Sequence, residues 1–268
     1  MKKKLYFVAL AVFVAIFLVS GFFLIRYFTQ INRAEKVYQE LADIKQQALA
    51  EAQTKAKENG ESQPSLEEVA TPEGDTVTIL PEYAPIYERN SDTVGWICID
   101  GTNIDYPVVQ RKDTENYYLH RDFYGNSSNQ GTIYVREQCN VDVPSDNVVI
   151  YGHRTNAGTM FGALQNYKKQ DFWKDHQYIQ FDTLTEHHKY QILAVFTIQS
   201  TRDSNFQYHQ FVDAQGEGEF ENFVSTAKSL SLYDTGVSAE PGDKLITLST
   251  CEGASKTGRL VIVAKRVE

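Results

Sequence analysis

The sequence predicts a mainly β protein, an eight-stranded barrel with several helices, preceded by an N-terminal transmembrane helix and a helical stalk. Two observations carry this prediction. From about residue 76 the apolar runs are short and rich in β-branched and aromatic residues, and clusters of Gly, Asn, Asp and Pro separate them, which is typical of a sheet protein. Near the N-terminus, by contrast, the chain contains one long apolar run.

This N-terminal run indicates a membrane anchor. Residues 5–25 are 21 consecutive residues without a charge, and a helix rising about 1.5 Å per residue would extend them over roughly the 30 Å of a bilayer's hydrocarbon. The lysines at 2–4 favour a cytoplasmic N-terminus. We therefore expect residues 1–26 to be a cytoplasmic tip and single-pass anchor in the cell membrane, with the rest extracellular. A cleaved signal peptide is the alternative, but its apolar core is typically about 7–15 residues and ends at small residues, whereas Ser20 and Gly21 lie within this run.

The charge is divided between the two parts of the chain. Residues 1–33 carry five basic and no acidic side chains, so in a chain of net charge −9 the remainder carries −14. Because nucleic-acid binding needs basic patches, the acidic outer part argues against a nucleic-acid partner.

The cysteines do not indicate a disulfide framework, since there are only three. Cys98 lies in an apolar stretch and is interpreted as a small core residue, whereas Cys139 lies in a polar stretch and is assigned no role. A bridge between these two would leave Cys251 free, and the sequence leaves that pairing open.

Residues 27–75 are expected to form a helical stalk and linker. Positions 30–59 are rich in Ala, Glu, Lys and Gln, with apolar residues at roughly helical spacing. Positions 60–75 hold Gly, Ser, Pro and Glu with few apolar residues, which is typical of a linker. Residues 76–268 remain for the folded domain, enough for a single core.

Within that domain eight apolar runs predict eight strands, a number that suits a closed or nearly closed barrel. The runs are 94–99, 103–109, 131–135, 147–151, 178–182, 188–201, 244–249 and 260–266. Helices are expected at 83–90 and, with apolar residues on one face, at 218–229, and a turn is expected at 160–166.

Three residues that follow or open such runs are candidates for catalysis. Cys251 ends an apolar run and is followed by the polar loop 252–258, so its thiol would be exposed enough to react. Arg259 opens the next run, and a nearby cation favours the nucleophilic thiolate. His153 lies in a glycine-bounded loop after 148–151, and an imidazole can act as a base and then as an acid. Taken one at a time, the same residues could be a buried strand cysteine and two surface side chains.

No cofactor or metal is expected. His187 and His188 could bind a metal, but no third ligand at standard spacing accompanies them. The chain has no phosphate-binding glycine loop and no Cys-x-x-Cys pair. His120, His176 and His209 are interpreted as surface or core residues.

In combination these motifs resemble the sortases, the cysteine transpeptidases of Gram-positive surfaces. Leu248-Ser-Thr-Cys251 resembles their signature, Tyr151-Gly-His153 is similar to the loop of their catalytic His, and Arg259 stands where their catalytic Arg opens the last strand. Residues 94–109 are similar to their first two barrel strands, and 117–125 to class B members in particular.

The resemblance implies a sortase-type barrel in which Cys251 is the nucleophile, His153 transfers protons and Arg259 stabilises the oxyanion. By their position in the motif, Ser249 and Thr250 would line the substrate groove. The expected enzyme is membrane-anchored. It would cleave a C-terminal sorting signal of the Pro-x-Thr-Gly/Asn type after Thr and join the surface protein to an amine of peptidoglycan, or of its lipid-linked precursor, through a thioester.

Three alternative functions would make different use of these residues. A pilin-polymerising sortase would use the same site, and a membrane-tethered binding domain would need no nucleophile. A papain-like hydrolase carries Cys early and His late, and the order His153 then Cys251 counts against it. One departure from the family concerns the loop between Cys251 and Arg259, which at seven residues is shorter than is often found.

Overall fold

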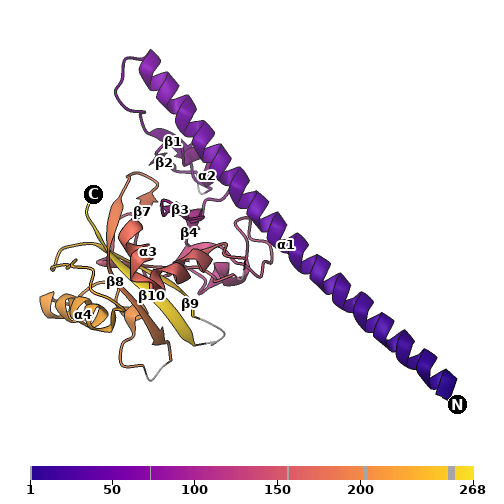
Figure 1. Cartoon of the computed structure of the whole chain (residues 1–268). Helices are drawn as coiled ribbons and strands as arrows, with labels where there is room; N and C mark the ends of the chain where they lie inside the picture. Colours follow the sequence, from indigo (N-terminus) through magenta and orange to yellow (C-terminus); the bar gives the residue numbers. More distant parts are fainter. Residues whose placement is uncertain (1, 73, 156, 202–203, 253–256) are drawn as a thin grey trace. The chain divides into compact units, whose positions relative to one another are not determined.

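Eight strands close into a barrel, in the order β10-β8-β7-β3-β4-β5-β6-β9 (Figure 1). Neighbouring strands are antiparallel except for the parallel pairs β4–β5 and β6–β9. Each strand overlaps one of the eight runs expected from the sequence, which confirms the predicted barrel. The strands are β3 (Thr93–Cys98), β4 (Asp105–Val109), β5 (Ile133–Val135), β6 (Asn147–Tyr151), β7 (Tyr178–Thr183), β8 (Lys189–Gln199), β9 (Leu245–Cys251) and β10 (Gly258–Arg266).

The computed structural model describes residues 2–72, 74–155, 157–201, 204–252 and 257–268, with the side chains of 1–5, 8, 9, 11, 27, 28 and 30–34 left out. The chain divides into two units, residues 1–39 and residues 40–268. The first unit is helical and belongs to α1 (Lys2–Glu58). In the described part of the chain, no helix combines the length and the apolar composition needed to cross a membrane. The lysine side chains at 2–4 lie outside the description.

The second unit begins inside α1, well before the domain start expected at residue 76. Leu41, Ala52 and Ala56 are buried. Lys45 Nζ lies 3.2 Å from Asp105 Oδ1 of β4 and 4.3 Å from the centre of the Trp96 ring of β3. Residues 40–58 therefore pack with the barrel, because their apolar positions and the lysine find partners on β3 and β4.

The segment 60–75, interpreted from its composition as a linker, contains a strand. β1 (Glu67–Ala70) pairs antiparallel with β2 (Thr76–Ile79). Val69 is buried in β1 while its neighbours on both sides are exposed. This alternation is the signature of a half-buried strand, and four residues are too few for it to stand out in a polar stretch.

Short helices connect the strands. The two expected helices are confirmed by α2 (Ala84–Tyr87) and α4 (Glu217–Leu230), and the segment expected as a turn forms the 3₁₀ helix η2 (Phe161–Lys168). Three more were not predicted: η1 (Tyr117–His120), α3 (Gln170–Asp175) and η3 (Tyr208–Gln210).

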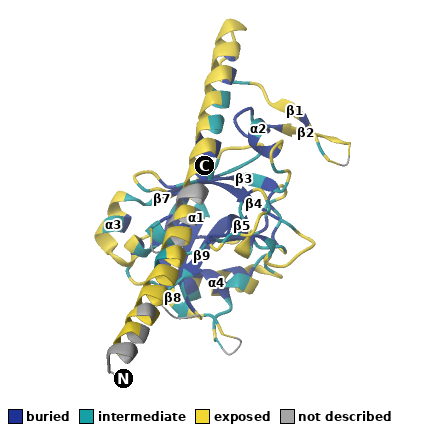
Figure 2. Cartoon of the chain, turned by 90° about the vertical axis from the view of Figure 1, so that its right-hand side faces the viewer, coloured by how far each residue is buried: buried dark blue, intermediate teal, exposed yellow. Residues whose placement is uncertain are grey.

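Helix α4 covers the outer face of β8 and β10 beside η3. Its buried residues are Phe220, Phe223, Val224 and Ala227, at the spacing of one helix face. The same cluster contains Phe196 of β8 and Val261 and Val263 of β10. The remaining positions of α4 are mostly exposed, whereas the barrel strands are largely buried (Figure 2). This packing closes a second apolar layer outside the barrel, next to the end of β9.

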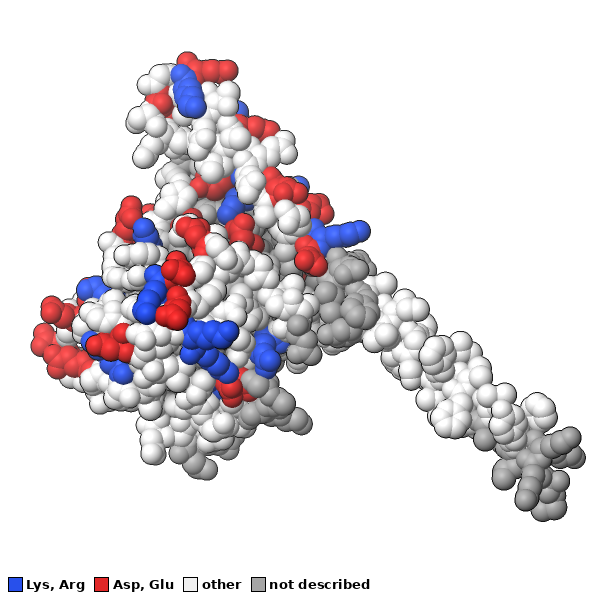
Figure 3. All heavy atoms as spheres, viewed as in Figure 1, with Lys and Arg blue, Asp and Glu red and all other residues white. Residues whose placement is uncertain are grey.

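Acidic and basic side chains are interspersed on the face drawn in Figure 3. Surface pairs of the domain include Lys168–Glu252 at 2.5 Å and Lys265–Asp243 at 2.8 Å. Because exposed ion pairs are typically worth about 0–1 kcal/mol, the stability of the domain rests mainly on its apolar layers.

All three cysteines are free, so the pairing of Cys98 with Cys139 that the sequence left open is not formed. The interpretation of Cys98 as a core residue is wrong. It is only partly buried at the end of β3, with Sγ 3.9 Å from Asp100 Oδ1. Cys139, from the polar stretch, is the buried one, and the backbone N–H of Val149 donates to its sulfur.

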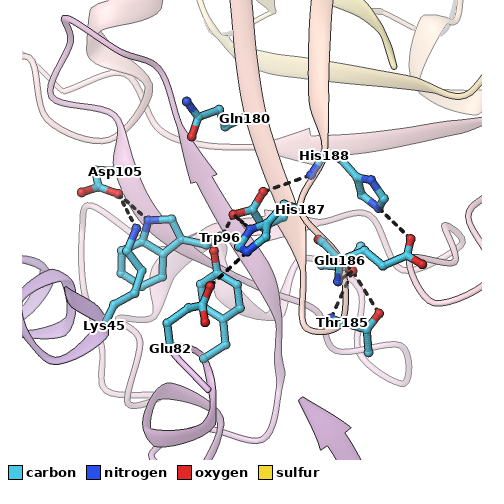
Figure 4. Close-up of polar contacts among 12 residues, drawn as sticks. Lys45, Glu82, Trp96, Asp105, Gln180, Thr185, Glu186, His187 and His188 are labelled. Atoms are coloured by element: carbon cyan, nitrogen blue, oxygen red, sulfur yellow. Dashed lines mark hydrogen bonds and ion pairs between the residues drawn. The ribbon is translucent and has the colours of Figure 1, made fainter. Parts of the chain in front are cut away.

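His187 forms a bridge between two acids at one end of the barrel (Figure 4). Its Nδ1 lies 2.8 Å from Asp182 Oδ2 and its Nε2 3.2 Å from Oε1 of the buried Glu82. The hydrogen bonds to Asp182 and Glu82 raise the pKa of His187 to about 10, so the ring is a cation at neutral pH. The described residues include no group of three or more acidic, His or Cys side chains able to hold a metal.

Candidate active site

The register of β9 and β10 places Cys251 directly opposite Arg259. The N–H of Glu252 donates to the carbonyl of Gly258 at 2.9 Å, so Cys251 and Arg259 form a non-hydrogen-bonded pair. In such a pair the two side chains share a face, with Cβ atoms about 4.5–5.5 Å apart. The short spacing between them therefore brings thiol and guanidinium together. The middle of the polar loop, residues 253–256, lies outside the described residues.

The parallel pairing of β6 with β9 brings the third candidate to the same place. Tyr151 pairs with Ser249, and the N–H of Gly152 donates to the Ser249 carbonyl at 3.2 Å. His153 follows at once, beside the carboxyl end of β9. A Cβ at Gly152 would lie 2.4 Å from Ile133 Cδ1 and 2.6 Å from Phe161 Cδ2, so a larger residue there would have to displace these packed side chains.

Cys251, His153 and Arg259 line one pocket of about 290 Å³. The other predicted site residues, Ser249 and Thr250, line it too. All five candidates are thus brought together. The remaining lining residues are Asn116, Leu119, Tyr134, Tyr151, Gly152, Ser200, Tyr208 and His209.

The two hydroxyl candidates lie on opposite faces of β9. Ser249 shares the face of Cys251 because strand residues two apart point the same way, and its Oγ lies 2.8 Å from the hydroxyl of Tyr208. The Thr250 Oγ1 is buried and has no hydrogen-bond partner among the described residues. A role for either in substrate binding stays a prediction.

The hydrogen bond of His153 shows which ring nitrogen carries the proton when the imidazole is neutral. Nε2 lies 2.7 Å from the carbonyl oxygen of Leu119. A carbonyl can only accept, so Nε2 carries the proton and Nδ1 is the nitrogen left to exchange protons. Burial lowers the pKa of His153, and the charges of His120 and Arg259 lower it further, against the opposing effect of the Leu119 hydrogen bond. The site therefore favours a neutral imidazole before substrate arrives.

Comparison with known proteins agrees with this geometry. The sortase domain model matches residues 97–267. The chain belongs to the sortase family. Sortase B of Staphylococcus aureus (strain NCTC 8325 / PS 47) is 32% identical over 192 residues, which cover 71% of this chain and 76% of that protein.

Solved structures of sortase B are similar over nearly the whole chain. A Staphylococcus aureus sortase B–substrate complex has a TM-score of 0.73 at 27% identity and covers 90% of this chain and 99% of the other. A sortase B complexed with triglycine has a TM-score of 0.72 at 26% identity and covers 89% and 99%. Together the comparisons make this chain a class B sortase, a cysteine transpeptidase.

The other two thiols of this sortase are outside the pocket. Burial raises the pKa of Cys98 to about 11, helped by the charges of Asp105 and Asp100, and burial raises that of Cys139 to about 11. Both are protonated at neutral pH and are poor nucleophiles.

Sequence reasoning missed the residues that hold the sortase site in place. Leu119 acts through its backbone carbonyl, which leaves no trace in residue type. Gln165 of η2 donates to the carbonyl of Cys251 at 3.2 Å, a contact between positions 86 apart in the chain. His120 is exposed, in agreement with one of its two interpretations, but the sequence did not reveal that its ring stacks on that of His153.

Proposed function

We propose that this sortase cleaves a C-terminal sorting signal of the Pro-x-Thr-Gly/Asn type after Thr and transfers the protein to an amine of peptidoglycan or of its lipid-linked precursor. The observation that carries the proposal is the pocket shared by Cys251, His153 and Arg259. The substrate complex of Staphylococcus aureus sortase B and the sortase B structure with triglycine, a peptide that begins with a primary amine, support a peptide donor and an amine acceptor.

In the first step, Nδ1 of the neutral His153 accepts the proton of the Cys251 thiol, and the resulting thiolate attacks the carbonyl carbon of the signal's Thr. The carbonyl electrons move to oxygen, and Arg259 stabilises this oxyanion with its fixed positive charge. We assign the role to Arg259 rather than to the next backbone donor, since the N–H of Glu252 is engaged with the Gly258 carbonyl. The C–N bond then breaks, protonated His153 gives its proton to the leaving amine, and a thioester remains on sulfur.

In the second step, an incoming amine replaces the thiolate. His153, now neutral, accepts a proton from the amine through Nδ1 as the nitrogen attacks the thioester carbonyl. The C–S bond breaks, the new amide leaves, and the thiolate–imidazolium pair is restored. Because the site lowers the pKa of His153, the ring gives up its proton readily in the first step. Proton transfer of this kind typically contributes about 10²–10⁴-fold to the rate.

We further propose that residues 1–26 anchor the enzyme in the cell membrane, with the N-terminus cytoplasmic and the domain outside. The support is the uncharged run 5–25 and the lysines before it. Apolar side chains described in this run, including Phe13, Phe17 and Ile25, are exposed. Tethering would raise the effective concentration of substrates held at the same membrane. Membrane fractionation of the full chain and of residues 40–268 tests this proposal, which fails if both are found in the soluble fraction.

A cleavage assay tests the catalytic proposal. Short sorting-signal peptides are incubated with the wild type, Cys251→Ala and Cys98→Ala, with and without triglycine, and products are identified by mass spectrometry. We expect cleavage after Thr and a ligated product with triglycine for the wild type and Cys98→Ala, and neither for Cys251→Ala.

The other outcomes identify the alternatives. Cleavage without ligation would make the protein a hydrolase. If a lysine-bearing pilin peptide offered in place of triglycine were ligated and triglycine were not, the protein would be a pilin polymerase. If Cys251→Ala left surface-protein anchoring in cells intact, a binding domain would replace the enzyme.

A further inference from the structure

One short helix supplies two contacts to the proposed proton carrier. Helix η1 ends with Leu119 and His120. The Leu119 carbonyl accepts the hydrogen bond from His153 Nε2 at 2.7 Å. The ring of His120 stacks on that of His153, with centroids 5.6 Å apart and planes inclined by 28°. Adjacent residues of η1 thus restrain both the edge and the face of one imidazole.

These two contacts restrain different motions. A single hydrogen bond to Nε2 fixes one edge of the ring but leaves its plane able to tilt by rotation about the Cβ–Cγ bond. A ring stacked on its face removes that rotation, and with it the movement of Nδ1. Proton transfer requires donor and acceptor within about 2.6–3.2 Å, so the orientation of this nitrogen decides whether it reaches the leaving amine.

We propose that His120 is a positioning residue that holds the His153 ring in its reactive orientation. A positive charge on His120 also lowers the pKa of His153. The inference rests on the proposed role of His153 in proton transfer. His120 itself is exposed at the surface, so the core of the barrel does not depend on it.

Charged and titratable groups surround His153 from four elements, and His209 of η3 also lines the pocket. His120 belongs to η1, Arg259 to β10 and the Cys251 thiol to β9. A positive charge on His120 or Arg259 disfavours a second positive charge on His153, whereas a thiolate at Cys251 favours it. Because the charge of His120 lowers the pKa of His153, removing the His120 imidazole should move the titration of His153 to higher pH.

Two substitutions of His120 separate the effect of its ring stacking from the effect of its charge. His120→Phe keeps an aromatic ring and removes the charge, whereas His120→Ala removes both. His176→Ala is the matched control, because His176 also stacks on a ring, that of Phe172 at 4.0 Å, but lies outside the pocket. Each variant is made in the full domain, and peptide kinetics are measured from pH 5 to 10 together with the NMR titration of His153.

We expect His120→Ala to lower kcat roughly tenfold with KM little changed, as misplacement of a reacting group does. His120→Phe should keep most of kcat at its optimum, while the His153 titration and the alkaline limb of the rate profile move to higher pH. His176→Ala should match the wild type in both measurements.

Three results would overturn the inference: wild-type kcat and pH profile in His120→Ala, equal loss of kcat in Ala and Phe variants, or an unmoved His153 titration in His120→Phe. These are distinguishable from failure of the proposed function. If the wild type failed to cleave any peptide, the titration would still decide whether the two rings interact.

Discussion

Gly131 is the residue whose substitution tests the geometry of the site most directly. It lies before β5 at φ +60°, in the left-handed region. A Cβ added there would lie 2.6 Å from the Leu119 carbonyl oxygen, 2.8 Å from that of Tyr118 and 3.1 Å from Cδ2 of His153. The first two contacts are too short to persist, so Gly131→Ala must displace the end of η1, including the carbonyl that holds His153.

The expected effect of Gly131→Ala has two parts, one on the free energy of unfolding and one on kcat. A non-glycine residue in the left-handed region costs about 1–2 kcal/mol, which lowers the free energy of unfolding. Displacement of the Leu119 carbonyl then releases the His153 ring, and a misplacement of about 1 Å can cost roughly 10²-fold in rate. We therefore expect Gly131→Ala to fold, with reduced stability, and to lose about 10- to 100-fold in kcat.

Gly125→Ala is the matched control. Gly125 has φ +79° and so carries the same backbone strain, but its added Cβ would meet only the Tyr117 hydroxyl, at 3.5 Å. Urea denaturation measures the stability of both variants, and cleavage of a quenched fluorescent sorting-signal peptide measures kcat and KM. If both variants lose similar stability and Gly131→Ala keeps the wild-type kcat, the reasoning about the Leu119 carbonyl is refuted.

Two further predictions concern stability. Tyr208→Phe leaves the buried Ser249 hydroxyl without its 2.8 Å partner and should cost about 1–3 kcal/mol by urea denaturation. Adding Ser249→Ala should recover part of that loss, whereas additive losses would contradict the idea of a mutually satisfied pair. His187 has a pKa raised to about 10 by its two carboxylate partners, so its charge stabilises the fold fully below about pH 6.5 and ever less as pH rises through 10. The difference in stability between wild type and His187→Gln should therefore narrow from pH 7 to 10, and a constant difference would show that the charge is not responsible.

The barrel strands could be predicted because each is a short apolar run with polar residues at both ends. Strand β6, at 147–151, was predicted to the residue, since Val148, Val149 and Ile150 form an unbroken apolar block. Strand β1 could not be predicted, because Val69 alone marks it within a polar stretch. The packing of residues 40–58 on the barrel was missed for a similar reason. The partners of Lys45, Asp105 and Trp96, lie about 50–60 positions further along the chain.

Part of the candidate site could likewise be predicted from the sequence, and part could not. Cys251, His153 and Arg259 could be selected because reactive residue types stand at the ends of strand-like runs, and strand ends carry exposed side chains wherever the chain folds into a sheet. Cys98 was misjudged because an apolar neighbourhood in sequence does not fix which side chain reaches the interior.

By itself the sequence determined which segments become strands and which side chains could supply a nucleophile, a proton carrier and a positive charge. These follow from local hydrophobic patterning and from the chemistry of each residue. Only the tertiary structure decided that β6 lies parallel to β9, that η1 closes over His153 with a carbonyl and a second ring, and that Gly131 leaves room for both. Such contacts join residues far apart in the chain, and backbone atoms make several of them, so no residue pattern encodes them.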